Sequence, residues 1–165
     1  MKSRAAAGAG PLIGLVRIDR VDLLRSLYEA VLIPPGVFEE LRIAEGRPGA
    51  LVLSRALTDG WLAVGRLAPN SDLERLQLLL DPGETEAILL AAQEQCRRLL
   101  IDDLRGRKVA QSRGLTISGT GGVLLAAKRR GLVASVGPIL ESLALSGYRL
   151  SDELVSRLLQ LAGEG

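Results

Sequence analysis

Residues 81–103 read DPGETEAILLAAQEQCRRLLIDD and contain a helix start followed by a short strand, the clearest helix–strand unit in the chain. Asp81 can cap a helix, a proline suits its first position, and Glu84 lies three residues after the cap. The apolar pattern predicts that the helix runs to about Arg97. The run Leu99–Ile101 is short, apolar and ended by two aspartates, which is typical of a buried strand.

The same alternation extends along the whole chain. Short apolar runs predict further strands at 30–33, 61–64 and 115–118, and residues 1–9 form either a disordered end or a weak first strand at Ser3–Ala7. Periodic segments predict helices at about 11–28, 36–43, 50–57, 73–80, 105–113, 120–130, 137–145 and 151–162. Strands that alternate with helices favour a parallel sheet with crossover helices on both faces. We therefore expect one α/β domain over residues 1–165.

Composition excludes several classes of site. The chain has 165 residues, 47% of them hydrophobic but only 2% aromatic, so the core must be aliphatic. It has no histidine and one cysteine, which removes Ser-His and Cys-His catalysis and zinc sites built from these residues. Cys96 fits a buried small side chain, and a single cysteine favours a reducing, cytoplasmic location. No apolar stretch reaches the roughly 18 residues of a membrane span, so no membrane partner is expected.

Acidic residues follow the predicted strands. In parallel sheets, ligands bind beyond the carboxyl ends of the strands, and several carboxylates gathered there repel one another unless a cation is present. Mg²⁺ or Mn²⁺ prefers oxygen ligands and supports phosphate hydrolysis without histidine. The candidates are Glu39 and Glu40 after the strand at 30–33, Glu84 and Glu86 in the helix capped by Asp81, and Asp102 and Asp103.

Three of these acids have a purely structural alternative. Glu84 fits the capping-box partner of Asp81, Asp103 fits the cap of the following helix, and Glu39 fits a solvent-exposed position. Glu40, Glu86 and Asp102 are each embedded among apolar residues, which favours a shared site.

Four segments together resemble the PIN-domain proteins, and more narrowly the DUF3368 group: residues 31–41 (VLIPPGVFEEL), 80–88 (LDPGETEAI), 100–107 (LIDDLRGR) and 119–124 (GTGGVL). The resemblance covers about residues 10–160. It implies a three-layer α/β/α fold with a central parallel sheet. It also implies Mg²⁺- or Mn²⁺-dependent cleavage of RNA, often as the toxin of a toxin–antitoxin pair.

The resemblance assigns roles to individual residues. Glu40, Glu86 and Asp102 match the family's catalytic, metal-binding acids, with Asp103 as the alternative to Asp102. Thr120 would hold a ligand or water at the start of its helix, or would serve as a plain N-cap. One departure is clear, because Gly8 stands where the family carries an acid at the end of the first strand.

These patterns leave three functions open. The first is a PIN-type metal-dependent ribonuclease, and the second is a catalytically impaired PIN-like module that binds RNA or protein because Gly8 replaces an acid. A nucleotide-binding domain is disfavoured, because no phosphate loop follows a strand.

Candidate partners follow from the charged and apolar helix faces. Arg105, Arg107 and Lys108, or the patch at Arg129–Arg130, are candidates to bind RNA phosphates, unless they are simply solvated. The apolar stripe of the helix at 151–162 is expected to pack on the core, with part of it available to an antitoxin protein or a homodimer.

Overall fold

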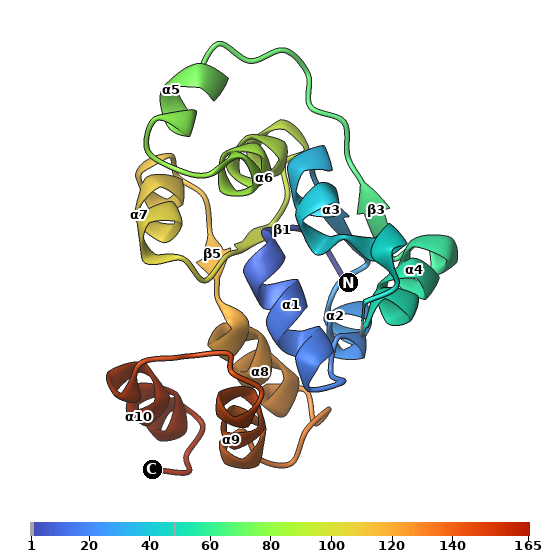
Figure 1. Ribbon diagram of the computed structural model, residues 1–165. Helices are drawn as coiled ribbons and strands as arrows, with labels where there is room; N and C mark the ends of the chain where they lie inside the picture. Colours follow the sequence, from blue (N-terminus) through green and yellow to red (C-terminus); the bar gives the residue numbers. More distant parts are fainter. Residues whose placement is uncertain (1, 48) are drawn as a thin grey trace.

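The centre of the sheet is the alanine-rich strand β1 (Arg4–Ala7). The computed structural model describes residues 2–47 and 49–165 (Figure 1). Within these residues the sheet has five strands, and every neighbouring pair is parallel. Their order is β3 (Leu62–Val64), β2 (Ala30–Ile33), β1, β4 (Arg98–Leu100) and β5 (Ile117–Ser118). The predicted α/β fold with a central parallel sheet is therefore confirmed.

Alanine suits the central strand because helices cover both of its faces. Ala5, Ala6 and Ala7 are fully buried. Ala5 and Ala7 face one apolar core and Ala6 faces the other, because side chains alternate along a strand. The segment that looks weakest in the sequence is thus the middle of the molecule, and its small side chains leave room for helices above and below. Met1 lies outside the described residues.

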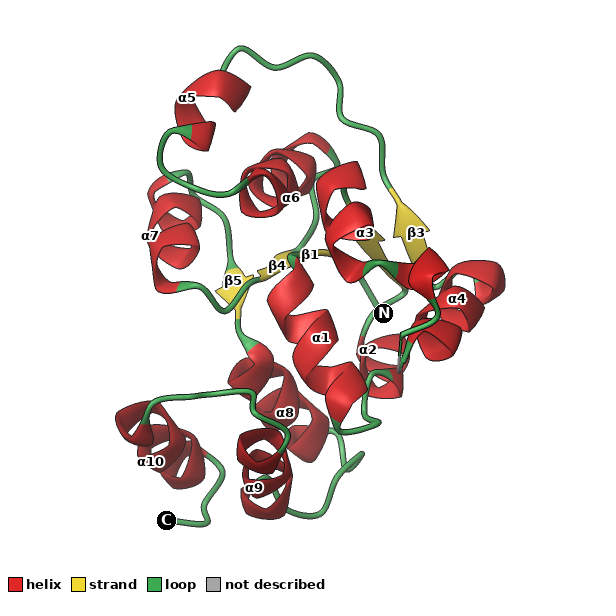
Figure 2. Cartoon of the chain, viewed as in Figure 1, coloured by secondary structure: helices red, strands yellow, loops and turns green. Residues whose placement is uncertain are grey.

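The helices form the two outer layers (Figure 2). The core on one face includes α1 (Ala9–Arg17), α2 (Asp22–Leu27), α4 (Ala50–Asp59), α8 (Thr120–Arg129) and α9 (Gly137–Leu145). The core on the other includes α6 (Pro82–Gln93) and α7 (Leu104–Ser112). Helix α3 (Pro35–Leu41) contacts both α1 and α6, while α5 (Leu73–Gln77) packs on α6 and α10 (Asp152–Leu161) on α8. A short 3₁₀ helix, Ile43–Glu45, follows α3.

Several predicted helices end earlier than the apolar pattern indicates. Helix α6 ends at Gln93 rather than near Arg97, because Gln95 adopts a left-handed conformation (φ 51°) that reverses the chain into β4. Cys96 therefore lies in this connection, half-buried, and not in a helix. The helix predicted over 11–28 is divided into α1 and α2, because Asp19 is also left-handed (φ 56°).

Other boundaries differ as well. The helix predicted over 73–80 ends at Gln77, and the strand predicted over 115–118 is reduced to Ile117–Ser118. In the described part of the chain, no helix has the length and apolar character needed to cross a membrane.

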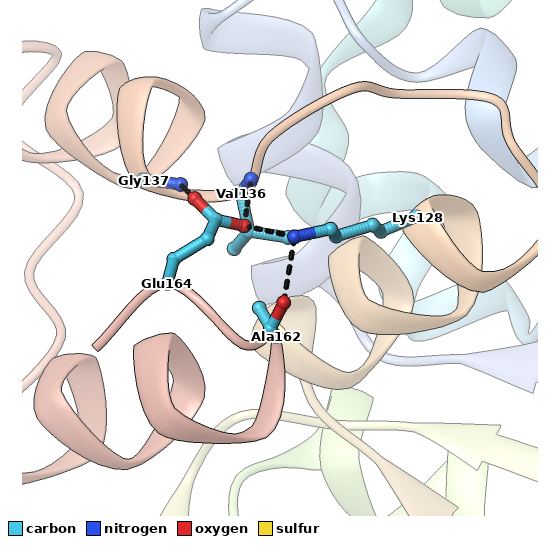
Figure 3. A network of polar contacts seen from close by, with 5 residues as sticks. All are labelled: Lys128, Val136, Gly137, Ala162 and Glu164. Atoms are coloured by element: carbon cyan, nitrogen blue, oxygen red, sulfur yellow. Dashed lines mark hydrogen bonds and ion pairs between the residues drawn. The ribbon is translucent and has the colours of Figure 1, made fainter.

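A polar network fixes the C-terminal end to the core (Figure 3). The carboxylate of Glu164 accepts hydrogen bonds from the Lys128 ammonium (2.8 Å) and from the backbone N–H groups of Val136 (2.8 Å) and Gly137 (2.9 Å). The same ammonium donates to the carbonyl of Ala162 (2.6 Å). These contacts, first that with Lys128, lower the pKa of Glu164 to about 2. The tail after α10 is thereby tied to α8 and to the start of α9.

Candidate functional site

The strand order reverses between β1 and β4, and a pocket lies at that point. Strands β2 and β3 lie on one side of β1, whereas the chain returns to the other side for β4 and β5. Gly8 directly follows β1, and its N–H donates to the Leu100 carbonyl of β4 (2.9 Å). Such a reversal opens a crevice at the carboxyl ends of the two strands, which is where ligands bind in open α/β sheets.

Five carboxylates line this pocket, which has a volume of about 220 Å³ and which we call the acidic pocket. They come from three separate segments: Glu40 from α3, Asp81 and Glu84 from the start of α6, and Asp102 and Asp103 from the end of β4. Gly8, Gly10 and Ile101 complete much of its wall. The structure thus gathers acids that are far apart in the sequence, with Glu40 and Asp103 separated by 63 positions.

The start of α6 places two of these acids side by side. Asp81 caps the helix, since its Oδ1 accepts from the backbone N–H of Glu84 (2.8 Å), as the sequence predicts. Burial raises the pKa of the Glu84 carboxyl to about 7, with further contributions from the charges of Asp81, Asp103 and Glu40. The predicted cap by Asp81 is therefore confirmed, but among the described residues the Glu84 carboxylate accepts no hydrogen bond from the Asp81 N–H, so the reciprocal half of the capping box does not form and the Glu84 side chain lines the acidic pocket instead.

The carboxylate of Glu40 lies in the same electrostatic environment. Pro35 occupies the first position of α3, as predicted, so that helix begins directly after β2 and its last turn carries Glu40 to the pocket. Burial and the charge of Asp81 raise the pKa of Glu40 above its usual value. In both Glu40 and Glu84 burial is the main cause and the charges of nearby carboxylates add to it, and a bound cation would offset both effects.

Asp102 is held by hydrogen bonds from two distant segments. Its Oδ1 accepts from the Thr120 N–H (2.7 Å), and its Oδ2 accepts from the Thr120 hydroxyl (2.5 Å) and from the Tyr148 hydroxyl. Gly119 allows this approach, because a Cβ there would lie 2.6 Å from Asp102 Oδ1. Gly119, not Thr120, occupies the N-cap of α8, so the N-cap interpretation of Thr120 is wrong.

Tyr148 was not identified from the sequence. Its ring lies against α1, where a Cβ on Gly14 would be 3.2 Å from three ring atoms and one on Gly10 would be 3.2 Å from the hydroxyl. The two glycines lie four residues apart, on one face of the helix. That spacing is the signal that could have indicated a docking groove for a large side chain. Burial, together with the charge and hydrogen bond of Asp102, raises the pKa of the Tyr148 phenol.

The structure does not bring Glu86 to the acidic pocket. Its Oε1 accepts from the Gly36 N–H (3.2 Å), at the start of α3, and its side chain lines a neighbouring pocket of about 690 Å³ together with Glu39 and Glu40. Residues two positions apart in an α-helix are separated by roughly 200° around its axis. Glu84 and Glu86 therefore face different sides of α6, and Glu84 is the one that lines the acidic pocket.

Asp103 caps the following helix, as predicted, and also lies at the acidic pocket. Its Oδ2 accepts from the Gly106 N–H (2.9 Å) and so caps α7. The same side chain lines the acidic pocket.

Gly8 occupies the position expected of the missing acid. It is the N-cap of α1, has extended backbone angles and makes no side-chain capping bond. A Cβ at this position would lie 3.7 Å from the Leu100 carbonyl oxygen and 4.0 Å from an Ile101 carbon, which are ordinary contacts. Space therefore does not exclude an aspartate here.

The predicted cations divide between two sides of the acidic pocket. Arg105 and Lys108 line an adjoining pocket of about 600 Å³ that shares Asp81, Glu84 and Asp103 with the acidic pocket. Arg107 instead donates to the Ile101 carbonyl (3.2 Å) and faces α10.

The donor chemistry of the acidic pocket fits a hard divalent cation, because all of its charged side chains are carboxylates. Across residues 2–47 and 49–165, no three acidic or cysteine side chains are already close enough to hold a metal ion. An ion would therefore have to draw several of the five carboxylates closer together.

Comparison with known proteins agrees with this architecture. The sequence profile of the DUF3368 family, a PIN domain, matches residues 5–164. No curated protein matches the chain. PIN domains are generally nuclease-like and typically use divalent metals. The chain has a parallel sheet with acids at its central crevice, and the family profile matches nearly its whole length. The chain therefore belongs to the PIN-domain family.

Proposed function

We propose that this protein is a ribonuclease that depends on Mg²⁺ or Mn²⁺ and cleaves RNA at the acidic pocket. The observation that carries the proposal is the gathering of five carboxylates at the crevice between β1 and β4. The raised pKa values of Glu40 and Glu84 are consistent with it, because burial and then the charges of neighbouring carboxylates disfavour their ionised forms, and a bound cation would favour those forms.

In this proposal Glu40, Asp81, Glu84 and Asp103 would hold the metal. A bound divalent ion would supply an activated water and would offset the charge that develops on the phosphate. Asp102 would orient the site, because Thr120 and Tyr148 fix both of its oxygens. The pocket geometry favours Glu84 over Glu86 as the acid from α6, while the family resemblance favours Glu86.

The substrate would approach past Arg105 and Lys108. Both line the pocket that adjoins the acidic pocket, and in this proposal they would contact RNA phosphates near the cleaved bond. Arg107 is placed between β4 and α10 and would contact a neighbouring part of the RNA strand.

The proposal is tested by cleavage of a labelled single-stranded RNA in Mn²⁺. Glu84→Gln removes a carboxylate from the pocket and is expected to lower the rate at least about 100-fold. Glu74→Gln is the matched control, because Glu74 is exposed on α5 and lines none of the pockets described above. Equal cleavage by the wild type and Glu84→Gln would sink the assignment. A loss in Glu86→Gln but not in Glu84→Gln would support the family-based role of Glu86 instead.

Gly8 favours a second candidate, a catalytically impaired PIN-like module that binds RNA or protein. A glycine supplies no ligand at the crevice, although the structure has room for a side chain. Gly8→Asp separates the two candidates. Cleavage that appears only in this variant would mark the natural protein as a binding module, and cleavage by the wild type would mark it as an enzyme.

A role as the toxin of a toxin–antitoxin pair, in the cytoplasm, is a further part of the proposal. The apolar stripe of α10 packs on the core through Val155, Leu158 and Leu159, but Leu154 and Leu161 remain exposed (41% and 54%). An antitoxin protein or a second copy of the chain would cover this exposed part. Co-expression with a candidate antitoxin, followed by co-purification with the wild type and with Leu154→Ser, tests the assignment.

A further inference from the structure

A second charged pocket lies at the opposite end of the sheet from the acidic pocket. It has a volume of about 510 Å³ and is lined by Lys2, Arg97, Arg98 and Arg130, together with Ser3, Leu27, Tyr28 and Ala126. We call it the basic pocket. Ser3 precedes β1 and Gly8 follows it, so about 17 Å of extended chain separates the two sites.

The four cations of the basic pocket have no acidic partner. No carboxylate is among the described residues that line it, and none of the four forms an ion pair within residues 2–47 and 49–165. Their hydrogen bonds go to carbonyl groups, from Lys2 to Arg25 (3.3 Å) and from Arg130 to Ser26 (3.5 Å). Arg4, which follows the pocket residue Ser3, does not belong to the lining and forms an ion pair with Glu94. The pocket therefore concentrates positive charge in a chain whose net charge is only +2.

Tyr28 provides a polar group within the same pocket. Its side chain is buried (8% exposed), and burial raises the pKa of its phenol. The charges of Arg98 and Arg130 act in the opposite direction, and both arginines line the pocket together with Tyr28. Two guanidinium groups and one hydroxyl group that face a common space can donate several hydrogen bonds to one oxyanion.

We propose that the basic pocket binds phosphate groups, namely those of a single-stranded RNA. Arginine guanidinium groups match phosphate oxygens in a bidentate geometry, and the pocket offers three of them, two at the start of β4 and one just after α8. The site is separate from the acidic pocket and does not depend on metal. It therefore anchors RNA whether or not the acidic pocket cleaves it.

The test measures binding of a fluorescent 12-nucleotide RNA by anisotropy, in chelator and over a series of salt concentrations. The variant is Arg98→Gln with Arg130→Gln. The matched control is Arg55→Gln with Arg75→Gln, which makes the same change in net charge at exposed positions outside the pocket. Each phosphate contact on a single strand contributes about 0.7 to the salt dependence of binding. Loss of two contacts is expected to reduce the slope by about 1.4 and to weaken binding about 25-fold at 0.1 M salt.

A second arm identifies the source of the phosphate. Pyrophosphate is added to each protein and the shift in melting temperature is recorded. One outcome is that pyrophosphate raises the melting temperature of the wild type but not that of the Arg98→Gln, Arg130→Gln variant, while both proteins bind RNA equally well. That result would support phosphate binding at the pocket but would assign a small phosphate compound, and not RNA, as the ligand. If that variant does not fold, Lys2→Gln with Arg97→Gln removes two exposed cations of the same pocket.

Three results would overturn the proposal. One is that the pocket variant and the control variant bind RNA and pyrophosphate equally. Another is that the pocket variant changes the molecular mass in solution but not RNA binding, which would mean that the basic pocket pairs with the acidic pocket of a second copy. The third is that Glu84→Gln weakens binding in chelator as much as the pocket variant does. Loss of cleavage in Glu84→Gln without loss of RNA binding would leave the basic pocket intact, so the two proposals fail independently.

Discussion

Tyr148→Phe removes one hydroxyl and tests how Asp102 is held. The phenylalanine ring keeps its contact with α1 at Gly10 and Gly14, so the change is confined to the hydrogen bond with Asp102 Oδ2. Asp102 retains the two hydrogen bonds from Thr120, and the carboxylate is therefore not left without partners.

The expected loss of stability follows from the type of bond. A hydrogen bond to a charged group contributes roughly 1.5–3 kcal/mol. Tyr148 is only half-buried and Asp102 keeps two donors, so the lower end applies, about 1.5 kcal/mol. For a domain of this size, that corresponds to a fall in melting temperature of about 3–6 °C.

The measurement is urea unfolding followed by circular dichroism, with Tyr28→Phe as the control. The chain has two tyrosines, and the Tyr28 hydroxyl makes no hydrogen bond within the described residues. Its removal should change the free energy of unfolding by less than about 0.5 kcal/mol. If Tyr148→Phe costs no more than Tyr28→Phe, the Tyr148–Asp102 bond does not stabilise the fold and its proposed role in orienting Asp102 fails.

Three further predictions concern titration and close packing. Both phenols have raised pKa values, so absorbance titration of Tyr28 and Tyr148 should show ionisation above pH 10. The stability that the two protonated phenols contribute should be present below pH 10 and be lost as the pH rises through their pKa values in the folded protein. Ionisation of both phenols at pH 10 would contradict this. The pKa of Glu164 is lowered from 4.5 to about 2, so the stability that its carboxylate contributes is present above pH 4.5 and is lost as the pH falls towards 2. If the difference in the free energy of unfolding between wild type and Glu164→Gln stays constant from pH 6 to pH 2, this prediction is wrong. Gly36→Ala would place a Cβ 2.5 Å from Glu86 Oε2, so the flexible Glu86 carboxylate must move away and lose its hydrogen bond from the Gly36 N–H. We expect a loss of about 0.5–1.5 kcal/mol, which should disappear in combination with Glu86→Ala in a double-mutant cycle by urea unfolding; a loss that persists in the double variant would contradict this.

Local signals in the sequence predict much of the fold. The caps at Asp81 and Asp103 form as predicted, because each is a contact between residues three apart. The strands at 30–33 and 61–64 appear within one residue of their predicted bounds. Short apolar runs flanked by turn residues are typical of the buried strands of a parallel sheet, so their positions can be predicted locally. The early end of α6 at Gln93 was not predictable, because the left-handed Gln95 interrupts a pattern that otherwise continues.

The candidate site was only partly predictable. Glu40, Asp102 and Asp103 were identified because each follows a strand, and carboxyl ends of parallel strands lie at one edge. Glu84 and Glu86 are not distinguished by that rule, because both are near the start of α6. The rotation of α6 against β1 and β4 decides which of them faces the pocket.

The sequence by itself determines the alternation of strands and helices, the caps, the absence of histidine and the supply of acids near strand ends, because these depend on neighbouring residues or on composition. Tertiary structure alone decides that the alanine strand is central, that Glu84 lines the acidic pocket in place of Glu86, and that Tyr148 reaches Asp102 across 46 positions. It also assembles the basic pocket from Lys2, Arg97, Arg98 and Arg130. These features depend on packing between segments that are distant in the chain, and the free energy of that packing leaves no local pattern in the sequence.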